Sequence, residues 1–379
     1  MTFITVRQNP MYRQMSFEEL LYDTGEFHSL ITNNKTNTRT YCVEVTSKLL
    51  RRYNINHMMD CLSKFNDKYE DLINRDKHEL YRSFKIPKRS GGLRQIDAPN
   101  EELSNALREL KGIFENDFKA LYHTTAFAYV KGRSTIDSIK RHQANESKWF
   151  AKFDLSNFFG STTPQFVMKM FSIIFPFSEI MKNPVGKTEL ETALSLCFLD
   201  GGLPQGTPIS PTITNIMMIP IDHVLSNKLR EYNGVKYIYT RYADDFLVSS
   251  KVSFSFKDIE KFIQDTLASY DAPFRINESK TRYGSSSGAN WNLGVMLNKD
   301  NKITVGHKKK RALIAMLHNY VKDKMNGITW ELNDLQVMEG YRSYCSMVEK
   351  ESIDNAVNKL SKKFNIDVVA MIKADIRGY

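Results

Sequence analysis

The sequence predicts an α+β chain in which helical segments flank a central region of antiparallel strands. Apolar residues recur mostly at helical spacing from Ser16 to about Tyr81. Short alternating segments joined by turn residues, the pattern of β-hairpins, occur at 84–99 and 237–249. From His307 onward helical spacing returns, which predicts an all-helical C-terminal region.

The composition is that of a globular protein with a basic surplus. Of the 379 residues, 41% are hydrophobic and 12% aromatic, so the chain can bury a sizeable core and is not intrinsically disordered. It carries 53 Lys and Arg against 43 Asp and Glu, a formal net charge of +10. This surplus is equally compatible with a well-solvated surface and with a polyanionic partner.

Membrane, secretion and disulfide signals are missing from the sequence. It has no run of about 18 uncharged apolar residues, so it predicts no membrane partner. The first residues lack the order of a signal peptide, and we expect a cytoplasmic protein. The four cysteines lie far apart, which excludes a CxxC metal knuckle and argues against a disulfide framework.

The first predicted hairpin is rich in positive charge. Within 84–99, Ser90-Gly91-Gly92 provide a glycine turn between two alternating runs. Four basic residues precede its first acid: Lys85, Lys88, Arg89 and Arg94. The segment from Glu101 to Leu121 then has helical spacing.

A strand and a Pro/Gly loop follow. Trp149 to Asp154 alternates like a strand that ends in a carboxylate. Segment 203–211 is too rich in Pro and Gly for regular structure. It predicts a loop with Ser210 as the N-cap of a helix and Pro211 at its first position. Pro220 predicts a kink within that helix.

Three acids lie where a metal site for phosphoryl transfer needs them. Asp154 ends a strand, and Asp244-Asp245 lie at the tip of the second hairpin. Mg²⁺ prefers oxygen ligands, and two such ions can activate a hydroxyl and neutralise a leaving pyrophosphate. Adjacent strand residues point to opposite faces, so we expect Asp154 and Asp244 to bridge the ions while Asp245 supports them. An isolated Asp-Asp pair is more often a surface turn.

Six segments, in order, resemble the motifs of reverse transcriptases of the bacterial retron and group II intron lineage. The segments are Ile86-Pro87-Lys88 with Gly91-Gly92-Leu93-Arg94, Phe153 to Phe159, Leu203 to Pro211, Tyr242-Ala243-Asp244-Asp245, Glu278 to Thr281, and Trp291 to Val295. A stand-alone, defence-associated member of this family is the most similar type. The resemblance implies a right-hand polymerase fold, with fingers, a palm that holds an antiparallel catalytic sheet, and an all-helical thumb.

The resemblance also implies the active-site residues. Asp154, Asp244 and Asp245 are expected to bind two Mg²⁺ ions, with Mn²⁺ as an alternative, and the backbone carbonyl of Leu155 is expected to be a further ligand. Phe159 is expected to be the steric gate that excludes ribonucleotides. The expected residues at the incoming dNTP are Lys88, Arg94, Phe159, Gln205, Gly206 and Lys280.

The remaining expected contacts are with nucleic acid. Leu293 and Gly294 match the primer grip, and the basic run Lys308, Lys309, Lys310 and Arg311 is expected to follow the nucleic-acid backbone. The expected divisions are a helical N-terminal extension (1–80), fingers and palm (81–302) and thumb (303–379). The thumb holds 13 Lys and Arg against 9 Asp and Glu.

The function implied is RNA-directed DNA synthesis, in which a primer 3′-hydroxyl attacks the α-phosphate of a dNTP. The partners are then an RNA template, most simply a dedicated non-coding RNA, together with a DNA product or primer and dNTPs, in antiviral defence. Protein-primed or template-independent DNA synthesis is an alternative. A catalytically silent, maturase-like RNA-binding scaffold and a viral RNA polymerase are two others.

Overall fold

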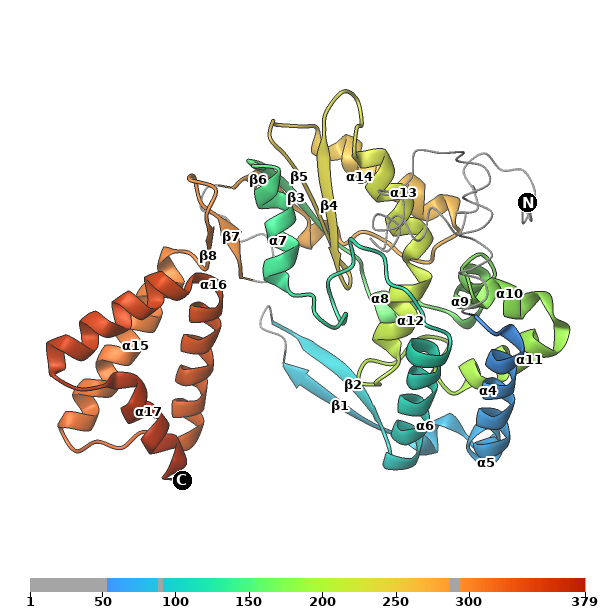
Figure 1. The fold of residues 1–379 in the computed structure, drawn as a ribbon, viewed down its shortest axis with the longest axis horizontal. Helices are drawn as coiled ribbons and strands as arrows, with labels where there is room; N and C mark the ends of the chain where they lie inside the picture. The colour runs from blue at the N-terminus through green and yellow to red at the C-terminus, as the bar shows by residue number, and fades with distance from the viewer. Residues whose placement is uncertain (1–52, 88–90, 287–293, 379) are drawn as a thin grey trace, which may run out of the picture.

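A four-stranded antiparallel sheet lies at the centre of the computed structural model, which describes residues 53–87, 91–286 and 294–378 (Figure 1). Its strand order is β4-β5-β3-β6. The strands are β3 (Trp149–Asp154), β4 (Tyr237–Tyr242), β5 (Asp245–Ser250) and β6 (Arg282–Ser285). Both the strand predicted to end at Asp154 and the hairpin with acids at its tip are confirmed.

The two faces of this sheet have different neighbours because side chains alternate along each strand. Phe153, Phe246 and Val248 belong to the main hydrophobic core, which includes helices α13 (Ile219–Leu229) and α14 (Phe256–Ser269). On the opposite face, a smaller core joins the sheet to α7 (Thr135–Ala144), β7 (Met296–Leu297) and β8 (Ile303–Thr304). That core consists of Ile139, Phe150, Leu247, Val295 and Leu297.

His142 of α7 anchors that helix to the sheet. Its ring is fully buried, with Nδ1 2.6 Å from the Ser249 hydroxyl and Nε2 2.8 Å from the Thr240 hydroxyl. Burial lowers the pKa of His142 to about 3, so the ring is neutral at physiological pH. His142 therefore has a structural role, because both of its ring nitrogens form hydrogen bonds with hydroxyl groups.

His142 gives the fold a specific acid sensitivity. Its folded pKa lies below the unfolded value, so the unfolded chain takes up a proton that the folded chain does not, and stability falls with pH below about 6.5. Between pH 7 and pH 5 we expect this group to cost about 2 kcal/mol of unfolding free energy. Urea unfolding at pH 7 and pH 5 measures this difference in unfolding free energy. The difference should be smaller by about that amount in the His142→Gln variant. Identical pH dependence in the two proteins would refute the assignment.

A long two-stranded hairpin projects from below the central sheet. It pairs β1 (Tyr81–Pro87) with β2 (Leu93–Pro99), and Ile86 lies opposite Arg94. The predicted hairpin is therefore confirmed, although its turn at 88–90 lies outside the described residues. Helix α6 (Glu101–Gly112) follows and continues as a π-helical turn, η2 (Ile113–Asp117).

Short helices surround the main core. The N-terminal helices of the described chain, α4 (Ile55–Lys68) and α5 (Glu70–Asn74), pack on α11 (Pro184–Ser195). The other elements are η1 (Lys77–Leu80), α8 (Phe158–Ser161), α9 (Pro164–Phe171), α10 (Phe177–Lys182), α12 (Ser210–Met217) and η3 (Glu278–Lys280).

The start of α12 differs from the expectation. Ser210 is the first residue of the helix and Ile209 occupies the N-cap position, without a side-chain cap. The predicted cap at Ser210 is thus wrong, because its hydroxyl donates to the Pro204 carbonyl at 3.1 Å and stabilises the preceding loop instead. The predicted kink appears as a break at Met218, with Pro220 in the first turn of α13.

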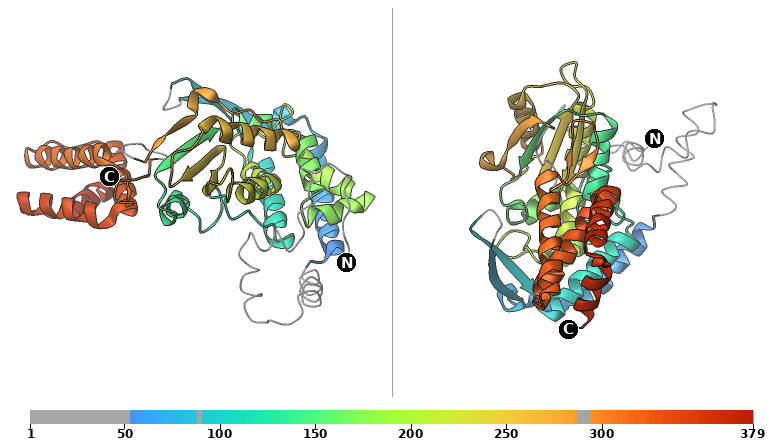
Figure 2. Two further views of the ribbon diagram at one scale, coloured as in Figure 1. Left: turned by 90° about the horizontal axis from the view of Figure 1, so that it is seen from above. Right: turned by 90° about the vertical axis from the view of Figure 1, so that its left-hand side faces the viewer.

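Three C-terminal helices form a separate unit beside the sheet, as Figures 1 and 2 show. They are α15 (His307–Met325), α16 (Leu332–Phe364) and α17 (Val368–Arg377), and they have their own buried core. Helix α16 departs from helical geometry at Glu349, whose carboxylate accepts the Val305 backbone N–H at 2.9 Å and so ties the unit to the preceding strand. Among the described residues, no helix is long and apolar enough to span a membrane.

Candidate active site

Strand register brings the predicted carboxylates together. Asp154 at the end of β3 lies directly opposite Asp245 at the start of β5, so their side chains share a face of the sheet. Asp244 lies in the two-residue turn between β4 and β5, next to Ala243, which has a φ of 57°. The Asp244 carbonyl accepts the Leu155 N–H at 3.0 Å, which fixes the turn against the end of β3.

Two lysines offset part of the negative charge. Lys280 lies 2.9 Å from Asp154, and Lys152 lies 2.6 Å from Asp245. Burial, followed by the charges of Asp245 and Asp154, raises the pKa of Asp244 to about 6. Burial also raises the pKa of Asp245, although Lys152 opposes this shift. The negative charge of Asp244 is thus unfavourable without an added cation.

This donor set fits a divalent cation. Carboxylate oxygens are the hard ligands that Mg²⁺ prefers, and Mg²⁺ is commonly held by one or two carboxylates plus substrate phosphates. A bound dication would stabilise the charged form of Asp244, which burial and the two neighbouring acids disfavour. The Asp154 side chain is 8% exposed and that of Asp245 is 16% exposed, so a bound ion would be only partly hydrated.

The loop before α12 links the sheet region to the β1–β2 hairpin. Gly206 has a φ of 128°, and a Cβ there would lie 3.1 Å from the Asp97 carbonyl, tighter than most real contacts. The Asp97 N–H donates to the Gln205 carbonyl at 2.9 Å. The structure therefore places Gln205 and Gly206 against the base of the hairpin that carries Arg94.

Phe158 and Phe159 have different environments. Phe158 is 3% exposed and packs against Phe274, with ring centroids 4.9 Å apart, as a core residue. Phe159 is half-buried, and its ring lies edge-on to Tyr129, with centroids 6.5 Å apart. Its carbonyl accepts the Leu203 N–H at 3.0 Å, which joins α8 to the Pro/Gly loop.

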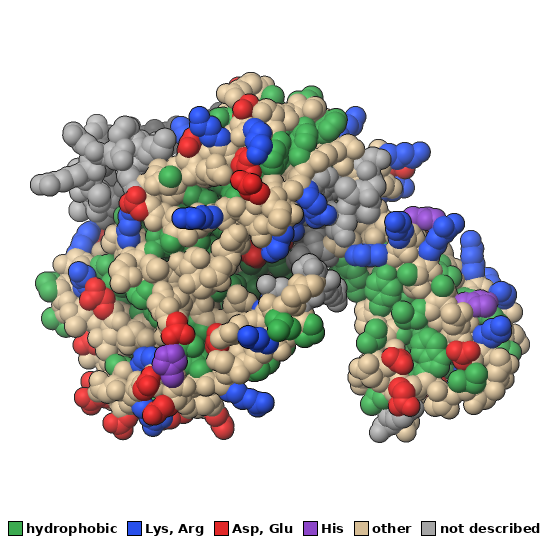
Figure 3. Space-filling view, turned by 180° about the vertical axis from the view of Figure 1, so that it is seen from behind, with side chains coloured by type: hydrophobic (Ala, Val, Ile, Leu, Met, Phe, Trp, Pro, Cys, Tyr) green, Lys and Arg blue, Asp and Glu red, His purple; other side chains and the backbone are tan. Residues whose placement is uncertain are grey.

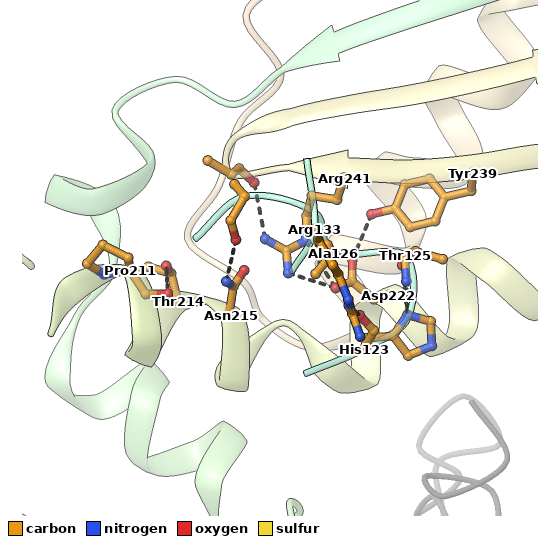
Figure 4. Close-up of polar contacts among 12 residues, drawn as sticks. His123, Thr125, Ala126, Arg133, Pro211, Thr214, Asn215, Asp222, Tyr239 and Arg241 are labelled. Atoms are coloured by element: carbon orange, nitrogen blue, oxygen red, sulfur yellow. Dashed lines mark hydrogen bonds and ion pairs between the residues drawn. The ribbon is translucent and has the colours of Figure 1, made fainter. Parts of the chain in front are cut away.

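Tyr129 is a site residue that sequence reasoning missed. It is 56% exposed, and its ring contacts Phe159. Asn215 of α12 donates to the carbonyl of Ala128 at 2.8 Å, next to Tyr129 in the chain (Figure 4). The structure thus places Tyr129 beside Phe159. Nothing in the spacing around Tyr129 indicated this.

Comparison with known proteins identifies the family. A model of the family described as reverse transcriptase (RNA-dependent DNA polymerase) matches residues 86–312, more than half of the chain. The chain belongs to the reverse transcriptase family. The retron Ec83 reverse transcriptase of Escherichia coli is 26% identical over 84% of this chain and 97% of its own. The retron Mx65 reverse transcriptase of Myxococcus xanthus is 28% identical over 66% of this chain and 58% of its own.

A solved structure of apo telomerase from Candida tropicalis also matches. It is 13% identical, covers 83% of this chain and 66% of its own, and has a TM-score of 0.44.

Family membership defines the activity and names the parts of the fold. The protein is an RNA-directed DNA polymerase with a right-hand fold, and it is similar to bacterial retron reverse transcriptases. The central sheet is its palm, the β1–β2 hairpin belongs to its fingers, and α15–α17 form its helical thumb. Reverse transcriptases copy an RNA template and generally use divalent metal ions, which agrees with the carboxylate cluster of the palm.

The four residues of the basic run at the start of the thumb differ in their contacts. Lys308 and Arg311 are exposed, whereas Lys310 pairs with Glu349 at 2.9 Å. Lys309 donates to the carbonyl of Gly294 at 3.1 Å, beside the expected primer grip. In the space-filling view, Lys and Arg side chains gather on the thumb, which stands across an open gap from the fingers (Figure 3).

Two sequence-predicted contacts lie outside the described residues. They are Lys88 in the fingers turn and Leu293 in the expected primer grip. Gly294 is described, with a φ of 99°, and a Cβ there would overlap Lys309 and lie 2.7 Å from the Tyr344 hydroxyl. A glycine is therefore needed where the thumb meets this segment.

A buried ion pair supports the turn that carries Asp244 (Figure 4). Arg241 and Asp222 are both fully buried, and an Arg241 nitrogen lies 2.8 Å from the Asp222 carboxylate. Arg241 also donates to the carbonyl of Ala243 at 3.2 Å, immediately before Asp244. The Tyr239 hydroxyl donates to Asp222 at 2.8 Å. Sequence reasoning missed this group, although an Asp within the apolar run of α13 was a signal.

Proposed function

We propose that Asp154 and Asp244 jointly hold two Mg²⁺ ions, with Asp245 in support, and that the palm catalyses phosphoryl transfer from dNTPs. The observation that carries this is the cluster of three carboxylates, in which burial and the charges of Asp245 and Asp154 raise the pKa of Asp244 to about 6. When bound, such ions lower the pKa of an attacking hydroxyl and neutralise charge on the leaving pyrophosphate. Mn²⁺ has the same preference for oxygen donors and is an alternative.

The remaining side chains bind and orient the substrates in this proposal. Arg94 on the exposed fingers strand offers a guanidinium that can bind triphosphate oxygens in a bidentate manner. Lys280 is 56% exposed and forms an ion pair with Asp154. Its long, positively charged side chain can contact the same phosphates. Lys88, Gln205 and Gly206 complete the expected dNTP contacts, and the Leu155 carbonyl completes the metal ligands.

Phe159 is proposed as the gate that selects deoxyribose. The half-buried ring lies on α8, beside Tyr129 and shortly after Asp154 in the chain, and a ring at this position supports a collision with a 2′-hydroxyl. Phe159→Ala should raise the rate of rNTP incorporation relative to dNTP incorporation by about tenfold or more. Single-nucleotide extension with each substrate gives the ratio.

The neighbouring ring provides a matched control for this test. Phe158→Leu perturbs the core against Phe274 and an edge contact with Phe159 but keeps the Phe159 ring, so its rNTP to dNTP ratio should stay close to that of the wild type. If Phe158→Leu changes the ratio as much as Phe159→Ala, sugar selection does not reside in Phe159.

The template is proposed to be a dedicated non-coding RNA that runs between the palm and the thumb. The exposed Lys308 and Arg311 supply positive charge for its backbone, and Gly294 and Leu293 are the expected primer grip. Sequencing the RNA and the DNA that copurify with the protein tests this. One structured RNA, partly complementary to the DNA, is the expected result. A broad mixture of cellular RNAs would contradict a dedicated template.

We further propose, from the resemblance to defence-associated members, that this synthesis serves antiviral defence. Phages should form fewer plaques on cells that express the wild-type protein than on cells that express the Asp244→Asn variant. Equal plaque counts across a broad phage panel would oppose this role. DNA covalently attached to the protein would favour the protein-primed alternative.

A further inference from the structure

Helix α4 and the π-helical turn η2 place three different metal-binding side chains together, away from the palm carboxylates. His57 and Cys61 lie one turn apart on α4, and Asp117 is the last residue of η2. One ligand atom from each side chain lies within 4.8 Å of the other two. In Figure 1, α4 and α6 lie on the side of the molecule opposite the thumb helices.

The sulfur–nitrogen distance in this group matches that in a tetrahedral site, and Asp117 lies slightly farther out. The Cys61 sulfur lies 3.6 Å from Nε2 of His57, and that nitrogen lies 3.8 Å from a carboxylate oxygen of Asp117. A tetrahedral zinc ion, with Zn–S of about 2.3 Å and Zn–N of about 2.0 Å, keeps its sulfur and nitrogen ligands about 3.5 Å apart. To complete such a site, the Asp117 carboxylate would move closer to the Cys61 sulfur and the His57 nitrogen.

The local backbone holds the three groups in place. Asn54 caps α4 by accepting the N–H of His57 at 3.1 Å, which fixes the first turn of the helix. The chain adopts the rare π-helical form just before Asp117, and such turns are often associated with functional sites. Helix α4 and η2 are in contact, so both sides of the cluster are anchored.

The direct contacts within the cluster are worth little by themselves. The side chains of His57 and Asp117 are 57% and 39% exposed, and an exposed pair 3.8 Å apart contributes little to stability. Burial and the nearby Asp117 raise the pKa of Cys61, so the free thiol keeps its proton. Coordination to a dication would form a sulfur–metal bond while the thiol proton leaves to solvent.

We propose that His57, Cys61 and Asp117 form a zinc-type site that joins α4 to η2, with a water as the fourth ligand. The soft sulfur and the imidazole favour Zn²⁺ or Co²⁺ over Mg²⁺, so this site is chemically distinct from the all-carboxylate palm site. Three protein ligands and one open position are a coordination that zinc readily accepts. Its role is to hold the N-terminal helix of the described chain against the fingers.

Cobalt titration of the full-length, metal-stripped protein tests this proposal. With Mg²⁺ in excess to occupy the palm carboxylates, one equivalent of Co²⁺ should produce a thiolate-to-cobalt charge-transfer band, which Zn²⁺ should then abolish. The palm carboxylates contain no sulfur, so they cannot produce this band. Zn²⁺ should also raise the melting temperature of the wild type.

Matched variants locate the site. Cys61→Ser should abolish the charge-transfer band, and His57→Gln and Asp117→Asn should each weaken cobalt affinity by at least about tenfold. Asp60→Asn on the same helix and Cys345→Ala in the thumb should bind as the wild type does. No sulfur band in the wild type, or a band that survives Cys61→Ser, would overturn the proposal.

Discussion

Asp244→Asn should abolish nucleotide incorporation while leaving the protein folded. The substitution keeps the shape of the side chain but removes the charge that Asp154 and Asp244 are proposed to share around the metal ions. Loss of about 4 kcal/mol of transition-state stabilisation corresponds to a rate about a thousandfold lower. Single-nucleotide extension under single-turnover conditions measures that rate.

Stability provides an independent readout of the same variant. Burial and two neighbouring acids raise the pKa of Asp244 to about 6, so its charged form is unfavourable in the metal-free fold. Asp244→Asn should therefore melt no lower than the wild type in the presence of a chelator. Asp271→Asn, which removes an exposed carboxylate that pairs with Lys169, is the control that should keep full activity. An active Asp244→Asn protein would refute the proposed site.

Removing Asp222 should have the largest effect on stability among single polar substitutions in the palm. Asp222→Asn leaves the fully buried guanidinium of Arg241 without a counter-ion, and breaking a buried pair in this way typically costs about 3–5 kcal/mol. Urea unfolding gives the loss. Arg241 also holds the carbonyl of Ala243, so the catalytic turn should lose its support in the same variant.

Two further variants distinguish the cost of an unpaired buried charge from the cost of losing an ion pair. The double variant Asp222→Leu with Arg241→Met removes both charges and should be more stable than Asp222→Asn. Glu146→Gln breaks the exposed Lys251–Glu146 pair, whose side chains are 58% and 66% exposed, and should change stability little. If Asp222→Asn costs no more than Glu146→Gln, the buried pair does not support the palm.

The strand and the two hairpins that the sequence predicted correctly depend on local pattern. The alternation from Trp149 to Asp154 and the turn at Asp244 specify a strand end and a hairpin tip without long-range information. Register then brings the acids together, because antiparallel pairing places Asp154 opposite Asp245. The fingers hairpin was predictable for the same reason.

The parts that could not be predicted depend on contacts between distant segments. Arg241 pairs with Asp222 across a helix–sheet interface, and Tyr129 contacts Phe159 from a loop earlier in the chain. In the basic run of the thumb, spacing alone could not show that Lys310 pairs with Glu349 at the kink of α16. Ser210 was misassigned as a cap because its hydroxyl has a partner in the preceding loop.

The central claim is that the protein copies RNA into DNA at a metal site formed by the palm carboxylates. The most direct measurement is extension of a DNA primer on an RNA template of defined mixed sequence, with dNTPs and Mg²⁺, followed by sequencing of the product. We expect DNA complementary to the template that ends at the template's 5′ end and is not formed by Asp244→Asn. A product of unrelated or homopolymeric sequence, a product built from rNTPs, or no product with either Mg²⁺ or Mn²⁺ would contradict the account.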